Sequence, residues 1–114
     1  MSKRLKLKYH HLGIPTKEPQ EGEEYLPELK VYAGGFKTSE FGIELMRYEE
    51  GCPLPEIVKN MPHIAFEVDD INKAIVGKRV IIEPNSPSKG VMVAFIEENG
   101  VPIEFIQIDN EDKQ

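Results

Sequence analysis

The chain of 114 residues is poor in cysteine and contains no long apolar run. Its only cysteine, Cys52, can form no disulfide within the chain, and no activating group lies beside it in the sequence, so we interpret it as a passive thiol. No segment approaches the ~20 consecutive apolar residues that a membrane span requires, and the first residues lack the apolar stretch of a signal peptide. These absences predict a cytoplasmic protein that does not use a membrane.

Basic charge is also scarce, with 14 lysines and arginines against 20 acidic residues and a formal net charge of −6. Binding to a phosphate backbone depends on clustered basic side chains, so this balance argues against a nucleic-acid partner. One basic cluster exists, and it alternates with apolar residues. That alternation predicts a first strand with a solvated basic face rather than a nucleic-acid-binding arm. The cluster consists of Lys3, Arg4, Lys6 and Lys8.

The pattern along the second half of the chain predicts the order strand, helix, strand, strand, strand. Asp69 and Asp70 are suited to cap a short helix over 71–76 that ends at Gly77. The four strands are expected over 63–68, 79–83, 91–97 and 101–108, with turns at 85–90 and 98–100.

The first half predicts the same order with a degraded helix. Strands are expected over 3–14, over 29–33 and, once or twice, within 36–48. A helix within 16–28 could only be short, because Gly22 and Pro27 would break it. The repeat predicts a single α+β domain over residues 1–114, with module one at 1–50, a linker at 51–61 that holds one helical turn, and module two at 62–110. We expect two small curved sheets related by a pseudo-twofold axis.

Each half also contains one histidine followed by one glutamate in matching strand contexts. His11 opens the segment HLGI within the first predicted strand, His63 opens the predicted strand 63–68, and Glu44 and Glu104 each interrupt an apolar run. Side chains alternate between the faces of a strand, so all four are expected opposite the apolar packing face. If the sheets curve around a common cleft, the four side chains converge in it.

Two neutral imidazoles and two carboxylates balance the charge of a divalent cation, which makes such a set tolerable in a partly buried cleft. Mixed nitrogen and oxygen ligands admit zinc, nickel, cobalt, iron or manganese. His10 shares a face with Leu12 and Ile14, which predicts a place on the packed or outer side. The remaining strand and turn glutamates lack the repeated context, and we interpret them as surface charges; they are Glu40, Glu67 and Glu83.

Four segments together resemble the vicinal oxygen chelate superfamily, which includes glyoxalase I, methylmalonyl-CoA epimerase, extradiol dioxygenases, fosfomycin-resistance enzymes and bleomycin-binding proteins. The segments are HLGI at 11–14, GIEL at 42–45, HIAFEVDDI at 63–71 and NGVPIEF at 99–105. The resemblance implies paired βαβββ modules around a metal cleft, with ligands on the first and last strands of each module. A fourth ligand at Glu44 is most similar to the glyoxalase I and epimerase branch.

This resemblance implies a metal-dependent lyase, isomerase or epimerase that acts on a small 2-oxo or 2-hydroxy carbonyl compound through a metal-stabilised enediolate. Glu104 is the first choice as the catalytic base and Glu44 the second. The weak helix before Leu29 lies where glyoxalase I frames its glutathione pocket, which weakens the case for glutathione here. Exposed sheet edges predict a homodimer.

Two other functions remain open at this stage. One is a non-catalytic small-molecule-binding module of the bleomycin-resistance type, which the compact chain and its few loops favour. The other is a metal-dependent thiol transferase of the fosfomycin-resistance type. That reaction needs a basic clamp on the substrate, and the chain offers only Arg47, Arg79 and Lys89 for it.

Overall fold

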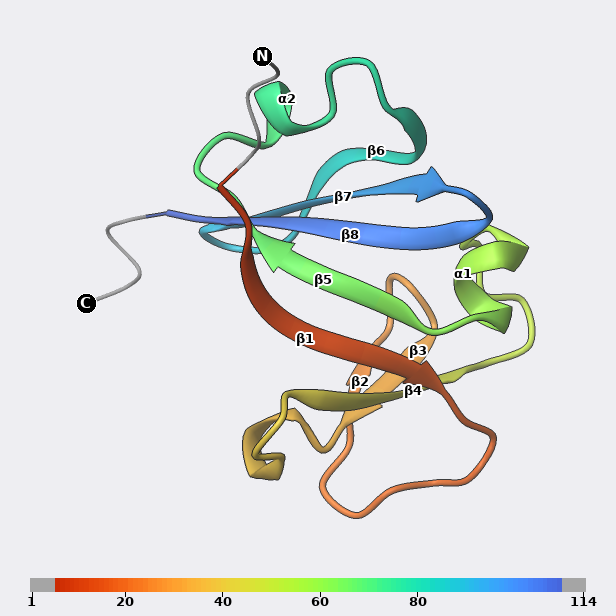
Figure 1. The fold of residues 1–114 in the computed structure, drawn as a ribbon. Helices are drawn as coiled ribbons and strands as arrows, with labels where there is room; N and C mark the ends of the chain where they lie inside the picture. Colours follow the sequence, from red (N-terminus) through yellow and green to blue (C-terminus); the bar gives the residue numbers. More distant parts are fainter. Residues whose placement is uncertain (1–5, 110–114) are drawn as a thin grey trace.

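A computed structural model describes residues 6–109 as one continuous eight-stranded sheet that curls on itself, with three short helical segments (Figure 1). The strand order across the sheet is β2-β3-β4-β1-β5-β8-β7-β6. The strands are β1 (Lys8–Pro15), β2 (Glu24–Leu26), β3 (Val31–Gly34), β4 (Ile43–Tyr48), β5 (His63–Glu67), β6 (Arg79–Ser88), β7 (Val91–Glu98) and β8 (Val101–Ile108). The helical segments are η1 (Phe36–Thr38), α1 (Glu56–Asn60) and α2 (Ile71–Ala74).

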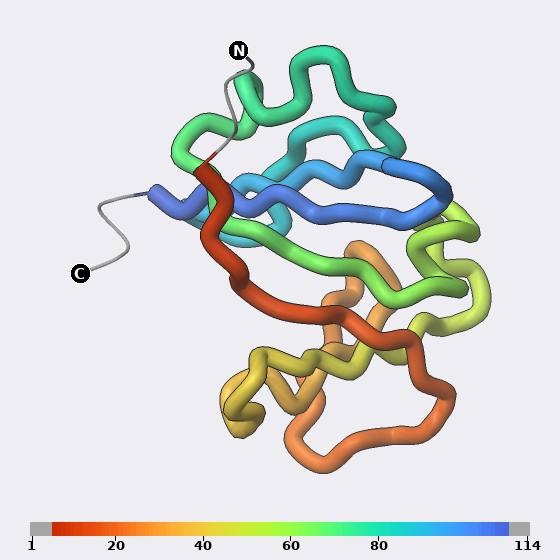
Figure 2. The backbone as a smooth tube through the Cα atoms, viewed as in Figure 1, coloured from red at the N-terminus to blue at the C-terminus, as the bar shows by residue number. Residues whose placement is uncertain are grey.

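The two halves of this sheet have the same topology. In each half the first strand pairs in parallel with the last, β1 with β4 and β5 with β8, and the other neighbours are antiparallel. An antiparallel pairing of β1 with β5 joins the halves. Figure 2 shows β1 (red) and β5 (green) in the middle, with the blue strands on one side and the orange and yellow strands on the other. The α+β fold with paired modules is therefore confirmed, although its two expected sheets are one.

The first half departs from the predicted element order. Residues 16–28 contain no helix, and their last part forms the three-residue strand β2 instead. Pro19 and Pro27 each remove a backbone donor, and Gly22 adopts a φ of 77°, so this short segment offers no run that could sustain a helix. The expected strand region 36–48 contains η1 and a single strand, β4.

The second half follows its prediction more closely, except in β6. This strand continues through the turn expected at 85–90 and ends at Ser88. It tolerates Pro84 and Pro87 because it is an edge strand whose register with β7 shifts several times, which is where proline is accepted in a sheet. The Ser86 hydroxyl donates to the Val91 carbonyl at 2.7 Å and so helps to hold the irregular strand in place.

The hydrophobic core lies between the second half of the sheet and α2. Asp70 caps this helix by accepting hydrogen bonds from two backbone amides, and Ile71 and Ala74 face the sheet. They pack on Phe105 and on a group that comprises Val68, Ala94, Ile96 and the half-buried Phe66. Ile64 shares a face of β5 with Phe66, but it lies at the far end of the strand from α2 and is exposed.

The start of β1 is shorter than predicted. The strand begins at Lys8, and both Leu7 and Tyr9 are exposed, so the expected apolar face of this region does not form within the described residues. Lys3 and Arg4 lie outside the described residues. Within residues 6–109, no helix has the length and apolar character needed to span a bilayer.

Candidate metal centre

The register of the four central strands places all four predicted ligands on one face of the sheet. Glu104 pairs with Ala65, and Ala65 pairs with His11, so these three side chains form one row across β8, β5 and β1. Residues that pair directly across neighbouring strands point to the same face. His11 and Glu104 therefore share a face, although 93 positions separate them in the sequence.

A second row repeats the first with the halves exchanged. Glu44 pairs with Gly13, and Gly13 pairs with His63, across β4, β1 and β5. His63 is two residues from Ala65 on the same strand, so the second row lies on the same face as the first. The pseudo-twofold repeat that the sequence predicts thus determines where the histidines and glutamates lie.

Three of the four side chains meet closely, and we call His11, His63 and Glu104 the donor cluster. Nε2 of His63 lies 3.1 Å from Oε1 of Glu104 and 3.3 Å from Nε2 of His11. Nε2 of His11 lies 3.4 Å from the same Glu104 oxygen. All three residues are buried, and their ligand atoms are close enough to hold one metal ion.

Glu44 lies at the edge of the donor cluster. Its Oε1 is 3.5 Å from Nε2 of His11, and its side chain is 23% exposed, compared with 11% for Glu104. Burial raises the pKa of Glu44, and the nearby Glu104 adds to this rise, while His11 opposes it. Glu44 is therefore the more readily protonated of the two carboxylates.

The pKa of Glu104 is shifted in the opposite direction from that of Glu44. Burial acts to raise its pKa, but hydrogen bonds from His11 and His63 outweigh burial and lower it. Burial correspondingly lowers the pKa of His11, while the hydrogen bond and charge of Glu104 outweigh that effect and raise it. Glu104 therefore stays ionised inside the sheet and supplies a fixed negative charge to the donor cluster.

His10 supports the donor cluster, contrary to the predicted place on the packed or outer side. A bulge in β1 makes His10 an extra residue between the pairs Tyr9 with Phe66 and His11 with Ala65. Its Nδ1 lies 2.8 Å from Nδ1 of His11, and its ring stacks on Phe36 at a centroid distance of 5.0 Å. The alternation of a regular strand could not show this contact; the doublet of histidines was the only sequence signal for it.

Gly13 makes room for the His63 ring. A Cβ on Gly13 would lie 2.2 Å from Cε1 of that ring, far inside van der Waals contact. The position equivalent to Gly13 in the second half is Ala65, which is fully buried. Glycine in the HLGI segment is thus explained by the buried histidine that crosses it.

A cavity of about 280 Å³ opens beside the donor cluster and is lined by both halves of the sheet and by α1. Its wall is mainly apolar. Representative lining residues are Val31 and Met46 from the first half, Val58 from α1, and Ile82, Val93 and Phe95 from the second half. Apart from the four predicted ligands, the polar lining side chains are Tyr48 and Asn85, and burial raises the pKa of Tyr48.

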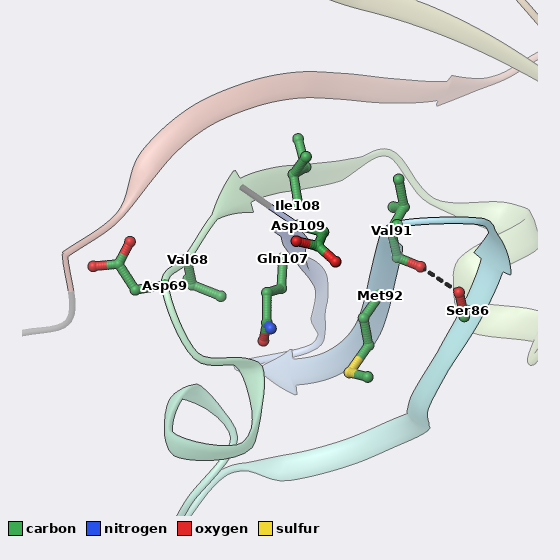
Figure 3. Close-up of a pocket in the computed structure, with 9 residues that line it drawn as sticks. Val68, Asp69, Ser86, Val91, Met92, Gln107, Ile108 and Asp109 are labelled. Carbon is green, nitrogen blue, oxygen red and sulfur yellow. Dashed lines mark hydrogen bonds between the residues drawn. The ribbon is translucent and has the colours of Figure 1, made fainter. Parts of the chain in front are cut away.

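A larger hollow of about 500 Å³ lies on the side of the sheet that carries α2 (Figure 3). Two of its polar side chains already serve the fold. The Gln107 side-chain oxygen accepts the Ile71 amide at 2.8 Å, and Ser86 donates to the Val91 carbonyl. Among the described residues no histidine lines this hollow, whereas the donor cluster lines the smaller cavity.

The basic residues considered for a substrate clamp lie elsewhere. Arg47 pairs with Glu23 and stacks over Tyr32 at 4.0 Å, and Arg79 pairs with Glu97 at 3.6 Å. Lys89 is exposed and does not line the cavity.

The structure also shows the exposure of the remaining acidic residues and of the cysteine. Glu40 and Glu83 are exposed, as predicted, whereas Glu67 is half-buried and its charge acts on His10. Cys52 is buried and free, which agrees with a passive thiol.

No family model matches the chain, and no curated protein matches it. Among solved structures it is similar to a hypothetical protein from Bacillus halodurans, with 25% identity, a TM-score of 0.71, and coverage of 92% of this chain and 96% of that one. It is also similar to methylmalonyl-CoA epimerase from Mycobacterium tuberculosis, with 17% identity, a TM-score of 0.68, and coverage of 99% and 96%. The likeness to the epimerase concerns the fold alone, and it supports the vicinal oxygen chelate fold for this chain.

Proposed function

We propose that the donor cluster and Glu44 bind a divalent metal ion, and that the protein is a metal-dependent isomerase, epimerase or lyase for a small 2-oxo or 2-hydroxy carbonyl compound. The observation that carries the proposal is the convergence of two imidazole nitrogens and one carboxylate oxygen within 3.1 to 3.4 Å of one another. These atoms are buried and come from both halves of the sheet.

The spacing of these atoms fits a metal ion. Ligand distances of ~2.0–2.2 Å for imidazole nitrogen and carboxylate oxygen correspond to roughly 3.3–3.6 Å between the corners of a tetrahedron. The three separations within the donor cluster, from 3.1 to 3.4 Å, fall at or near this range. Glu44 lies 3.5 Å from Nε2 of His11, but it is not part of the group whose ligand atoms all lie within 4.8 Å of one another. Neutral histidines, two carboxylates and a divalent cation also sum to zero charge, which suits a partly buried site.

A bound divalent ion would supply Lewis-acid polarisation of a substrate oxygen and so acidify the adjacent C–H bond. We assign proton transfer to Glu44, which reverses the order of choice that the sequence suggested. Glu44 is the more exposed carboxylate, contacts only His11 within the donor cluster, and has a raised pKa. A base close to its working pH transfers protons best, whereas Glu104 is held ionised by both histidines.

One observation favours a second candidate, the non-catalytic binding module. Metal-binding histidines almost always donate their second ring nitrogen to a partner. Nδ1 of His63 is buried and has no hydrogen-bond partner among residues 6–109, which weakens the case for metal at this ring. The thiol transferase receives no such support, because no basic side chain of the described residues lines the cavity.

Calorimetric titration with zinc and with cobalt tests the metal site. We expect the native protein to bind one ion per chain, Glu104→Gln to lose binding by about 100-fold or more, about 3 kcal/mol, and the exposed Glu83→Gln control to match the native protein. Chelator treatment of the loaded protein should lower the melting temperature. Equal binding by the native protein and Glu104→Gln would rule out this site.

Solvent exchange tests the proton transfer separately. In deuterated water, the loaded protein should exchange the carbon-bound hydrogens next to the carbonyl of 2-hydroxyacetophenone, and Glu44→Gln should abolish exchange while it retains metal. Metal binding without exchange by the native protein would favour the binding module.

The edge strands β2 and β6 also support a homodimer, which light scattering during gel filtration tests.

A further inference from the structure

We propose that the substrate of this site is a small, mainly apolar molecule without a charged carrier group, which presents two adjacent oxygens to the metal. This inference rests on the proposed function and specifies its substrate class. It excludes polyanionic carriers such as coenzyme A, and also free glutathione, from the cavity.

The shape and lining of the cavity are the first support. A volume of about 280 Å³ is slightly below the roughly 300–1,000 Å³ of most small-molecule sites, so the substrate is a small molecule. The wall opposite the ligands is apolar, with Met46, Val58 and Phe95 among its residues. Apolar surface gains from contact with an apolar substrate body and penalises a buried charge.

The distribution of charge is the second support. Within residues 6–109, no lysine or arginine lines the cavity, and none lines the adjoining hollow at its mouth, where Glu28 is the charged residue. Arg47 follows Met46 on β4 and so points to the opposite face of the sheet, where it pairs with Glu23. A further hollow shares Leu26, Ala33 and Glu44 with the cavity. Its cation is Lys37, which lies 3.9 Å from Glu24. Apart from a bound metal ion, a substrate anion would therefore meet no compensating cation among the described residues that line the cavity and its mouth.

The two neutral polar groups of the wall complete the specificity of the site. Tyr48 shares a face with Glu44 and Met46 on β4 and is half-buried, and its hydroxyl can donate to a substrate oxygen. Asn85 lies at the mouth and is exposed. These groups can bind a carbonyl or hydroxyl oxygen, but they supply no positive charge.

A matched pair of chelators tests the inference on the zinc-loaded protein. Benzohydroxamic acid and 4-carboxybenzohydroxamic acid present the same two oxygens and the same ring, and they differ by one distal carboxylate. We expect calorimetry at neutral pH to show at least tenfold tighter binding of the uncharged probe. Acetohydroxamic acid, which lacks the ring, should bind about tenfold more weakly than benzohydroxamic acid.

Two variants on β6 separate charge at the cavity from charge elsewhere. Asn85→Lys adds a cation at the mouth and should reduce the preference for the uncharged probe to threefold or less. Ser88→Lys adds the same charge to an exposed position of the same strand that does not line the cavity, and it should leave the preference unchanged. Melting curves verify that both variants are folded.

The outcomes distinguish this inference from the proposed function. Zinc binding with equal or tighter binding of the carboxylated probe overturns the substrate class and leaves the metal site intact. An unchanged preference in Asn85→Lys also overturns it, because the charge of the cavity then does not select the ligand. Absence of zinc binding overturns both proposals.

Discussion

The two halves of the sheet share a topology but differ in packing. The second half carries α2 on its outer face and contains most of the core cluster, whereas every residue of β4 in the first half is half-buried. The ligand positions are nevertheless repeated in both halves. We infer that the register of β4, β1, β5 and β8 determines where the ligand candidates lie. The helix α2 stabilises one half and is not needed for the geometry of the site.

The largest expected effect tests whether the two halves differ in packing. Phe105 and Leu45 each follow the glutamate of their half, so they are equivalent positions. Phe105→Ala should cost about 3–5 kcal/mol of unfolding free energy, because a core ring beneath α2 is lost. Leu45→Ala should cost less than about 2 kcal/mol, because that residue is only half-buried. Denaturant unfolding measures both, and equal losses would show that the halves are packed alike.

The next effect tests the close approach at the join of the halves. Gly13→Ala places a methyl group against the buried His63 ring and should cost about 1–3 kcal/mol by overpacking. It should also weaken zinc binding, because the ring must move. Ala65→Gly, at the equivalent position, should cost about 1 kcal/mol and leave zinc affinity nearly unchanged. Full zinc affinity in Gly13→Ala would contradict the assigned role of this glycine.

His10 provides a sharper contrast, because His11 has a hydrogen-bond partner on its second ring nitrogen, whereas His63 has none in the part of the chain that the structure describes. A neutral His10 that accepts at Nδ1 would fix the proton of His11 on Nδ1 and leave Nε2 for the metal. His10→Leu should weaken zinc binding about tenfold, and His10→Asn, which keeps an acceptor, should recover part of the loss. Nitrogen NMR shifts of His11 report the tautomer, and an unchanged tautomer in His10→Leu would remove this role.

The smallest effect concerns pH and the metal-free protein. Glu104 has a lowered pKa, so its stabilisation is present above its ordinary value of 4.5 and is lost as pH falls. His11 has a raised pKa, so its stabilisation is present below 6.5 and is lost as pH rises. The melting temperature in chelator should therefore peak between about pH 4.5 and 6.5. A melting temperature that rises steadily from pH 5 to 8 would contradict this electrostatic account.

Much of the second half could be predicted from sequence, because its apolar alternation and its turn residues agree. Asp70 caps α2 as expected, although the helix ends at Ala74 and not at Val76, and Glu104 opposes Phe105 on β8. The first half was harder, because strand β2 has three exposed residues and so no apolar pattern. Propensity also favoured a turn over the irregular edge strand that Ser86 holds in place.

The candidate site shows a similar limit. Strand parity placed the four ligand candidates on one face, but parity assumes a regular strand. The bulge at His10 breaks that assumption, and it was invisible because it depends on the pairing of β1 with β5. The apolar cavity wall could not be predicted from the sequence either. It joins residues from α1, β3, β4, β6 and β7 that only the closed sheet brings together.

The pairing of the first strand with the fifth, and of the fifth with the last, has a consequence for how the protein matures. Ribosomes release a chain from its N-terminus onward, so Glu104 becomes available after both His11 and His63. Until β8 docks beside β5, the nascent chain holds these histidines without the buried carboxylate that joins them. If the donor cluster binds an ion as proposed, the ion would be acquired after β8 has docked, and metal occupancy would report that step of folding.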